Sequence, residues 1–330
     1  MKQVPEEQHQ LPDLAPCSWN DEPLKLKYAL PKIWSQMNSR PFGIYWSQAL
    51  SYGRLWPEPT EAELNSFHNI AGVNEYLGGP KEKTPPKPDL LSRVIVKVAW
   101  VNDHGIVEPA PTILSMSKRY PEICDIGCGV GTFLSRMRDH GAIVTGVDPS
   151  SVSAEALRSK NIEFYSGVAE SLPAALSDRR FDVVTMLHCL PCCRAPALAL
   201  SNALSLLKAD GFLVVEVSNM DCLGFLKYGP AWWHTDAGRN LHFFTKASLT
   251  KLLGRVGATP IEWEYRGFVT QFTQGWIDTM DVVWDGLFQG RSTSVPRPSL
   301  LNSLSYLPRA LVSNQSRKYE AIRVYAKLSQ

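Results

Sequence analysis

Short apolar runs alternate with stretches of helical periodicity between residues 120 and 217. The apolar runs predict strands at 123–126, 142–147, 162–165, 181–187 and 212–217. A helix with Leu134 and Met137 on its apolar face follows the first run, and further helices are predicted at 151–159 and 196–207. This alternation predicts an α/β fold, a mostly parallel sheet with helices on both faces, which binds ligands at the carboxyl ends of its strands.

The flanks of this region have a different character. Residues 1–88 are rich in proline and tryptophan and show little periodicity, so they predict an irregular extension and a candidate cap over a bound substrate. Within it, residues 79–88 (GPKEKTPPKP) predict a linker or exposed loop. Apolar positions in 90–101 predict a helix that packs on the sheet. We therefore expect an N-terminal extension at 1–88 and a main domain at 89–330, with a lid segment at about 219–244 after the fifth strand.

Charge and composition narrow the function classes. The chain has 34 Lys+Arg and 32 Asp+Glu, so its net charge of +2 offers no broad positive field for nucleic acid. The first ten residues are polar and broken by proline, which is unlike a signal peptide, and no apolar run reaches the length of a membrane span. Seven cysteines, an odd number, indicate free thiols in a reducing compartment. We therefore expect a cytoplasmic enzyme with no nucleic-acid partner and no membrane span.

Residues 122–149 carry the most informative pattern, EICDIGCGVGTFLSRMRDHGAIVTGVDP. Gly127, Gly129 and Gly131 follow a strand and open a helix, where they let the backbone turn tightly and let a ligand lie against it. The start of that helix offers unpaired N–H groups to polar atoms of the ligand. Asp148 ends the second strand, where a carboxylate can accept hydrogen bonds from both hydroxyls of a ribose. This is a nucleotide-binding βαβ unit.

The glycine spacing favours one class of ligand over another. A dinucleotide site reads G-x-G-x-x-G, whereas this chain reads G-x-G-x-G with Asp125 two residues before the first glycine. A carboxylate there repels a pyrophosphate and suits a ligand with an ammonium group. The pattern resembles the first two motifs of class I S-adenosylmethionine-dependent methyltransferases, a Rossmann-like family with a seven-stranded sheet. The resemblance implies S-adenosyl-L-methionine as cofactor, with Asp125 near its methionine end and Asp148 on its ribose. An NAD(P) oxidoreductase, or a Rossmann domain with another ligand, is the alternative.

A second segment, residues 167–173 (GVAESLP), resembles the part of these methyltransferases that borders the adenine. Val168 stands where the family often has aspartate, so the backbone near Ala169 must serve instead. The alternative is a helix-capping loop with Glu170 in solvent. The resemblance implies a cofactor site made of Asp125, Gly127, Cys128, Gly129, Gly131, Asp148, Pro149, Val168, Ala169, Glu170, Leu187 and His188.

Candidate catalytic residues follow the fourth and fifth strands. His188 comes at the end of the fourth strand, which in this family lies beside the transferred methyl, and a histidine can take a proton at neutral pH. Its alternative role is to pack on the cofactor or order the loop. Residues 240–257 (NLHFFTKASLTKLLGRVG) resemble the block that closes the acceptor pocket in small-molecule methyltransferases related to the ubiquinone-pathway O-methyltransferases. His242 and His234 are therefore further base or acceptor candidates, with a structural role as the alternative for each.

Three other interpretations remain open. Pro191–Cys192 resembles the nucleophile motif of 5-methylcytosine methyltransferases, although it falls too far beyond the strand. The cysteines at 189–193 and 222 lack the paired spacing of a metal site, so no metal is expected. Aromatic residues of the extension can form either an acceptor pocket or a small core, and core is the commoner outcome: Trp34, Tyr45, Trp46 and Trp56.

Together these observations predict a methyltransferase that acts on a small-molecule acceptor, most simply a hydroxyl. Residues 56–64 (WPEPTEAEL) resemble a segment that precedes the catalytic domain in bacterial methyltransferases of glycan, lipid and secondary-metabolite pathways. A methyltransferase-like protein that binds cofactor without turnover is the non-enzymatic alternative.

Overall fold

A seven-stranded sheet organises the molecule, in the order β11-β12-β9-β8-β5-β6-β7. The computed structural model describes residues 11–30, 40–68, 90–288 and 290–329. The strands of this sheet are β5 (Glu122–Ile126), β6 (Ile143–Asp148), β7 (Glu163–Ser166), β8 (Phe181–Leu187), β9 (Leu207–Ser218), β11 (Ala258–Arg266) and β12 (Ala321–Leu328). The neighbouring strands β9, β8, β5, β6 and β7 pair in parallel, in that order across the sheet. β12 runs antiparallel to both β9 and β11. The predicted α/β methyltransferase-type sheet is confirmed.

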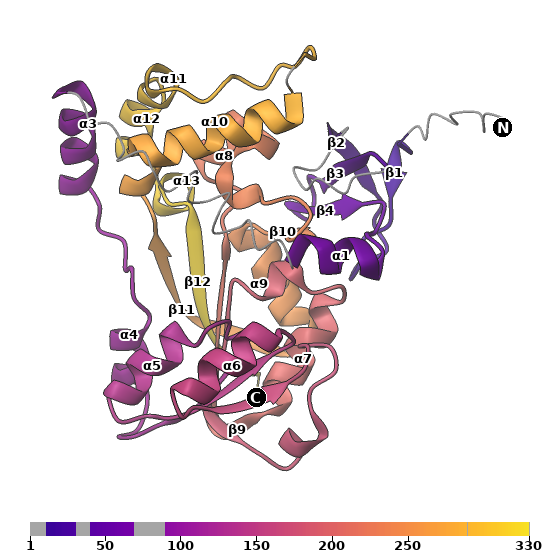
Figure 1. Ribbon diagram of the computed structural model, residues 1–330, viewed down its shortest axis with the longest axis vertical. Helices are drawn as coiled ribbons and strands as arrows, with labels where there is room; N and C mark the ends of the chain where they lie inside the picture. Colours follow the sequence, from indigo (N-terminus) through magenta and orange to yellow (C-terminus); the bar gives the residue numbers. More distant parts are fainter. Residues whose placement is uncertain (1–10, 31–39, 69–89, 289, 330) are drawn as a thin grey trace, which may run out of the picture.

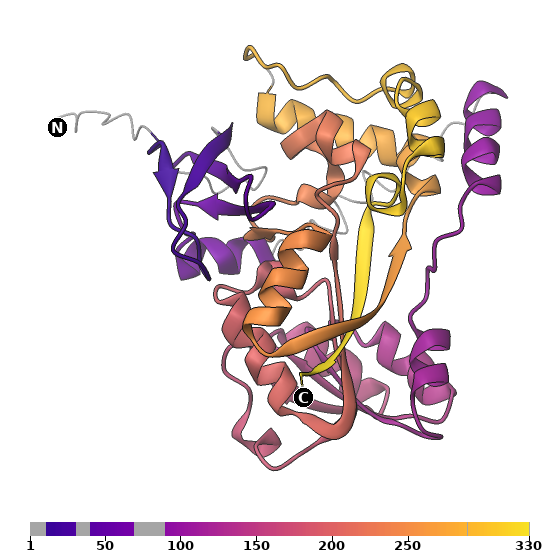
Figure 2. The same ribbon diagram turned by 180° about the vertical axis from the view of Figure 1, so that it is seen from behind.

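Helices cover the sheet and fill its connections (Figure 1). Those of the main domain are α3 (Leu90–Val101), α4 (Ala110–Met116), α5 (Thr132–Asp139), α6 (Ser151–Ser159), α7 (Pro196–Ser205), α8 (Leu223–Tyr228), α9 (Lys246–Arg255), α10 (Gln274–Phe288), α11 (Leu300–Leu304), α12 (Leu307–Val312) and α13 (Gln315–Lys318). Short 3-10 turns are η1 (Ala174–Leu176), η2 (Leu190–Cys192), η3 (Gly229–Ala231), η4 (Trp233–Thr235) and η5 (Val269–Phe272). α10 to α13 lie between β11 and β12 in the chain, and they stand together with α8 at one end of the molecule (Figures 1 and 2).

The N-terminal region is more regular than expected. It contains β1 (Leu14–Ala15), β2 (Leu24–Leu30), β3 (Phe42–Ser47), β4 (Tyr52–Trp56) and α1 (Glu61–His68). These strands form an antiparallel sheet that is completed by β10 (His242–Phe243) of the main domain. The prediction of an irregular extension is wrong for this part, because β3 is buried along its whole length and so shows no alternation. Tyr45 and Trp46 are core residues, whereas Trp34 lies outside the described residues.

Helix α3 forms at the predicted position but does not pack on the sheet. Its buried side chains are Ser92, Ile95 and Ala99, and the helix contacts η5. Val94 and Val98, two of the apolar positions in 90–101 on which that prediction rests, are exposed. Helical periodicity identifies the helix but does not tell which of its faces is covered, because apolar residues occur on both sides of α3. No helix in the described ranges is long and apolar enough to cross a membrane.

Candidate functional site

The carboxyl ends of β5, β6 and β8 meet at one edge of the sheet, as parallel pairing requires. Asp125 lies near the end of β5, opposite Thr185 of β8, and is only 2% exposed. The Thr185 hydroxyl donates to Asp125 Oδ1 over 2.6 Å. Burial raises the pKa of Asp125 to about 7; the Thr185 hydrogen bond opposes this rise and the nearby Asp148 carboxylate adds to it. Asp125 is therefore a carboxyl group that changes its charge near neutral pH.

The three glycines of the turn face different surroundings. All have positive φ, the region that favours glycine. A Cβ on Gly127 would lie 2.7 Å from the Cys189 side chain, and one on Gly131 would lie 2.8 Å from Leu157. A Cβ on Gly129 would meet no atom within 4 Å. Two glycines are thus required by packing, while the third borders open space.

The groups beside that open space are polar. Asp148 Oδ2 accepts from the Gly129 N–H at 3.0 Å, and its Oδ1 accepts from Ser150 N at 2.9 Å. α5 begins directly after Gly131, and no side chain caps its N-terminus. Uncapped N–H groups at a helix start form a site for an electronegative ligand group. The open space at Gly129 therefore has a carboxylate, a helix start and a backbone without Cβ around it.

The remaining cofactor candidates play different local parts. Pro149 is exposed beside Asp148, and Val168 is 43% exposed. The Ala169 carbonyl accepts from Asn202, and Glu170 Oε1 accepts from the backbone N–H groups of Arg194 and Ala195 at the start of α7. Glu170 therefore holds the two residues that lead into α7. Leu187 is half-buried, whereas the Cys128 side chain is buried against Gly146 in the core, so only its backbone can face a ligand.

His188 follows β8 directly and is held by a buried carboxylate. Its backbone has a φ of 58°, a strained conformation for a residue other than glycine. Its N–H donates to the carbonyl of Glu216 at 2.9 Å, and its Nε2 lies 2.7 Å from Glu216 Oε1. The same Nε2 is 2.8 Å from Nη2 of Arg266. The imidazole is thus fixed by two residues, one on β9 and one at the end of β11.

Glu216 belongs to a row of charges that crosses three strands. The sheet register places it opposite Arg323, which in turn is opposite Glu264. Arg323 Nε donates to Glu216 Oε2 at 2.7 Å, and Arg266 Nε donates to Oε1 at 2.7 Å. Burial disfavours the ionised form of Glu216, but the His188 hydrogen bond and the charges of Arg323 and Arg266 outweigh it and hold its pKa well below its usual range. The carboxylate beside His188 therefore stays ionised.

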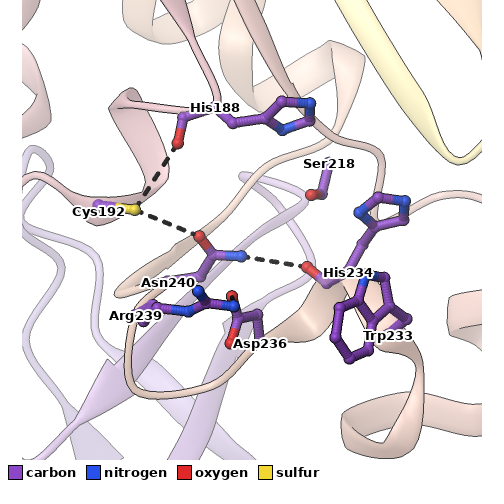
Figure 3. Close-up of a pocket in the computed structure, with 8 residues that line it drawn as sticks. All are labelled: His188, Cys192, Ser218, Trp233, His234, Asp236, Arg239 and Asn240. Carbon is purple, nitrogen blue, oxygen red and sulfur yellow. Dashed lines mark hydrogen bonds and ion pairs between the residues drawn. The ribbon is translucent and has the colours of Figure 1, made fainter. Parts of the chain in front are cut away.

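A cavity of about 340 Å³ opens beside His188 (Figure 3). It is lined by His188, Cys192, Ser218, Trp233, His234, Asp236, Arg239 and Asn240. These side chains come from the ends of β8 and β9, from η2 and η4, and from the following loop, so the cavity lies between the strand ends and the lid segment. Its volume suits a small molecule.

His234 faces His188 across this cavity. The two rings are parallel, with centroids 6.3 Å apart and planes inclined by 4°. His234 also packs against Trp232 and Trp276, each with its ring centroid 5.1 Å away. Its Nε2 lies 3.3 Å from Glu320 Oε1, close enough for an ion pair although the orientation makes no hydrogen bond. The cavity therefore has an imidazole on two sides, each with a buried carboxylate behind it.

His242 lies outside this cavity lining. It is paired with Arg54 in the β10–β4 ladder and is only 1% exposed. Its Nδ1 is 2.5 Å from the Tyr52 hydroxyl. Burial and the charge of Arg54 lower the pKa of His242 to about 3, so it is neutral at physiological pH. The second base candidate is thus a core residue of the N-terminal sheet, and we do not retain it as a base.

Cys192 lines the cavity but is a poor nucleophile. Burial, with Cys189 and Asp236 nearby, raises the pKa of its thiol well above the ordinary range. Its Sγ approaches the His188 carbonyl at 3.7 Å and Asn240 Oδ1 at 3.6 Å. Among the described residues, no three His, Cys, Asp or Glu side chains gather where they could hold a metal ion.

Sequence reasoning missed several residues of this site, above all Glu216 and Arg266. Glu216 is the one charged residue in an otherwise apolar run at 212–217, and a charge inside a predicted buried strand is a signal that it has a partner. Arg266 gives no such signal, because it comes 78 residues after His188 and meets it only through the register of β11, β12 and β9.

Comparison with known proteins identifies the kind of domain that these residues belong to. Residues 100–262 match the family model described as a methyltransferase domain. A ubiquinone biosynthesis O-methyltransferase of Coxiella burnetii is 26% identical over 162 residues, which cover 44% of this chain and 68% of that protein. The enzyme of the same name from Stutzerimonas stutzeri is 31% identical over 129 residues, covering 38% of this chain and 51% of that protein. The alignments thus span from half to two thirds of these curated relatives.

Solved structures with a related fold include two methyltransferases. The 1,6-didemethyltoxoflavin-N1-methyltransferase of Burkholderia thailandensis is 16% identical, with a TM-score of 0.45, and the match covers 89% of this chain and 98% of that one. Magnesium protoporphyrin IX methyltransferase from Synechocystis PCC 6803 is 15% identical, with a TM-score of 0.44, and the match covers 82% of this chain and 100% of that one. Similarity at this level gives no guide to the acceptor.

Proposed function

The chain belongs to the S-adenosylmethionine-dependent methyltransferase family, and from that premise we propose that it methylates a hydroxyl group of a small molecule held in the His188 cavity. The observation that carries this proposal is the pairing of His188 Nε2 with the buried Glu216 carboxylate at 2.7 Å, on the wall of a 340 Å³ cavity. A hydroxyl must lose its proton during methyl transfer, and a histidine oriented by a carboxylate is suited to accept it. The enzymes of Coxiella and Stutzerimonas are O-methyltransferases by name, which agrees with this choice.

The residues around Gly129 fit the cofactor. The space beside Gly129 accepts a ligand against the backbone, and Asp148 at its border can turn its carboxylate to the ribose hydroxyls. Asp125 would supply negative charge toward the ammonium group of the methionine part. Pro149, Val168, Ala169 and Leu187 would border the nucleoside through backbone and apolar contacts. When bound, the cofactor supplies an electrophilic methyl group.

The protein's own part in the reaction is to position the acceptor and remove a proton. Nε2 of His188 lies between an acceptor, Glu216 Oε1 at 2.7 Å, and a donor, Nη2 of Arg266 at 2.8 Å. We assign the ring proton to Nε2 on the Glu216 side, so that the lone pair at Nδ1 receives the hydroxyl proton. Arg266 donates to Glu216 and holds the carboxylate in place. Holding the acceptor oxygen at attack distance from the methyl group would provide much of the remaining rate enhancement.

The test is a comparison of two histidine variants. S-adenosylmethionine binding is measured by calorimetry, and methyl transfer is measured on a panel of hydroxylated small molecules, which should include any ligand that mass spectrometry finds on the purified protein. His188→Gln should lower the rate by about 10²–10⁴-fold while the cofactor Kd stays the same.

His140→Gln is the matched control, because His140 is exposed at the end of α5 and away from the cavity lining. It should leave both the rate and the cofactor Kd unchanged. Full activity of His188→Gln on a hydroxyl acceptor would contradict the base role. Absence of S-adenosylmethionine binding to the wild-type protein would contradict the cofactor site.

A further inference from the structure

Helix α3 presents an apolar face to solvent. Leu90 is 76% exposed and Trp100 is 68% exposed. The five exposed apolar side chains of α3 lie on the side away from the buried Ser92, Ile95 and Ala99, with Val98 and Trp100 on the two opposite flanks of that side. They are Leu90, Val94, Val98, Trp100 and Val101. We call these residues, together with Arg93 and Lys97, the α3 face. A soluble protein rarely leaves such a face without a binding partner.

Two basic side chains lie among these apolar ones. Arg93 and Lys97 are exposed, and helical spacing places them on the same side as Leu90 and Val94. α3 contains no acidic residue. Within the described part of the chain, neither Arg93 nor Lys97 forms an ion pair. The α3 face is therefore an apolar surface with positive charges that no acidic side chain of the described residues pairs with.

Charge distinguishes between the surfaces that could cover this face. If α3 packed on α3 of a second copy, it would bring Arg93 and Lys97 near the same residues of the partner without a counter-charge. Residues 79–88, directly before α3, add three lysines and one glutamate, so this segment would also repel the basic side chains if it covered them. An anionic lipid surface matches both the apolar side chains and the positive charges of the α3 face. Its acyl region accepts the apolar side chains, while its phosphates pair with Arg93 and Lys97.

The neighbouring elements also expose apolar side chains. α3 and α11 both pack on η5, and Figures 1 and 2 draw α3, α11 and α12 at the same end of the molecule. Leu301 of α11 and Val312 of α12 are 74% and 86% exposed. Residues 286–319 contain five Lys+Arg and no acidic residue, but Arg297 pairs with Asp281 and Asp285 of α10, and Lys318 is buried. Exposed apolar side chains thus continue beyond α3 along this end.

We propose that the α3 face binds the protein to the surface of anionic lipid membranes. α3 lies in the plane of the interface, with Trp100 and Leu90 at the level of the headgroups and Arg93 and Lys97 on the phosphates. The attachment is peripheral and depends on salt. It does not depend on the proposed reaction, since the α3 face includes no residue of the His188 cavity.

Vesicle sedimentation tests this proposal with the full-length protein. Vesicles of pure phosphatidylcholine are compared with vesicles in which roughly one third of the lipid is phosphatidylglycerol. The protein should sediment with the second kind only, and high salt should release it. A basic residue near an anionic surface contributes about fivefold in binding, so Arg93→Gln with Lys97→Gln should weaken it about 25-fold. Val94→Ser with Trp100→Ser should weaken it more than tenfold.

Leu198→Ser with Arg255→Gln is the matched control, because both residues are exposed on α7 and α9 and removed from the α3 face. Its binding should equal that of the wild type, and equal melting temperatures should show that all variants fold. Wild-type protein that stays in the supernatant with both vesicles would overturn the proposal. So would equal weakening in the control variant, or a solution dimer that Val94→Ser with Trp100→Ser dissociates, which would identify a second copy as the occupant.

Discussion

Replacing Asp125 with asparagine should make the protein more stable at alkaline pH and weaken its cofactor binding. Burial raises the pKa of this carboxyl from an ordinary 3.8 to about 7. The folded state therefore favours the protonated form. This contribution to stability is complete below pH 3.8 and is lost as the pH rises through 7. Above pH 7, keeping the ionised carboxylate buried costs about 4 kcal/mol, at 1.36 kcal/mol for each pKa unit.

Asparagine removes this cost without changing the shape of the side chain. The Thr185 hydroxyl, 2.6 Å from Asp125 Oδ1, can donate to the amide oxygen in the same way. The new NH₂ group would be buried without a partner, which costs about 1–3 kcal/mol and offsets part of the gain from removing the buried charge. We therefore expect the free energy of unfolding to rise by about 1–3 kcal/mol at pH 8. The offset does not depend on pH. Between pH 8 and pH 5.5, about 2 kcal/mol of the advantage over wild type should therefore disappear.

Urea unfolding at the two pH values measures this difference, and calorimetry at pH 8 measures the loss of cofactor affinity. Asp182→Asn is the matched control. Hydrogen bonds and charges from the Glu122 backbone, Lys118 and Lys208 outweigh burial and lower the pKa of Asp182. Asp182 therefore titrates below pH 5.5 in both the folded and the unfolded protein. This control should destabilise the protein equally at both pH values. It would refute the reasoning if the free energies of unfolding of Asp125→Asn and wild type differed by the same amount at pH 8 and at pH 5.5.

Three further variants test other parts of the site. Gly129→Val should abolish S-adenosylmethionine binding in calorimetry yet leave a folded protein, since its side chain enters open space and the positive φ costs about 1–2 kcal/mol. Cys192→Ser should keep near-wild-type methyl transfer, and complete loss of turnover would favour a cysteine nucleophile. His242→Ala should lower the free energy of unfolding by about 2–4 kcal/mol, because it removes a buried ring that contacts Tyr52. The methyl-transfer rate per folded molecule should stay near that of wild type. A loss of rate without a loss of stability would restore His242 as a base candidate.

Strands buried on both faces are the elements that the sequence predicts best. β5, β6 and β8 lie within one residue of their expected bounds, because central parallel strands read as continuous apolar runs. β3 is also buried throughout, but it belongs to a region of few regular patterns, and β4 finds one partner strand, β10, only far along the chain. The N-terminal sheet therefore depends on a long-range pairing that local sequence does not reveal.

The same reason explains which site residues could be predicted. Asp125, Gly129 and Asp148 lie within one βαβ unit, so their spacing in the sequence reports their proximity in space. Glu216 and Arg266 reach His188 from other strands, and only the register of the sheet brings them together. For His242 the sequence block was informative about position but not about burial, which depends on β4 and Tyr52.

Two buried carboxylates on the strands that flank β8 have opposite electrostatic surroundings. Asp125 on β5 has a hydroxyl as its partner and another carboxylate nearby, so its pKa rises toward neutrality. Glu216 on β9 has two guanidinium groups and His188, so its pKa falls and it remains charged. Environments that separate two carboxyl groups in this way mark different roles in a site. Glu216 is thus suited to hold His188 in one orientation around neutral pH, whereas Asp125 is suited to gain its charge when a cationic ligand group arrives.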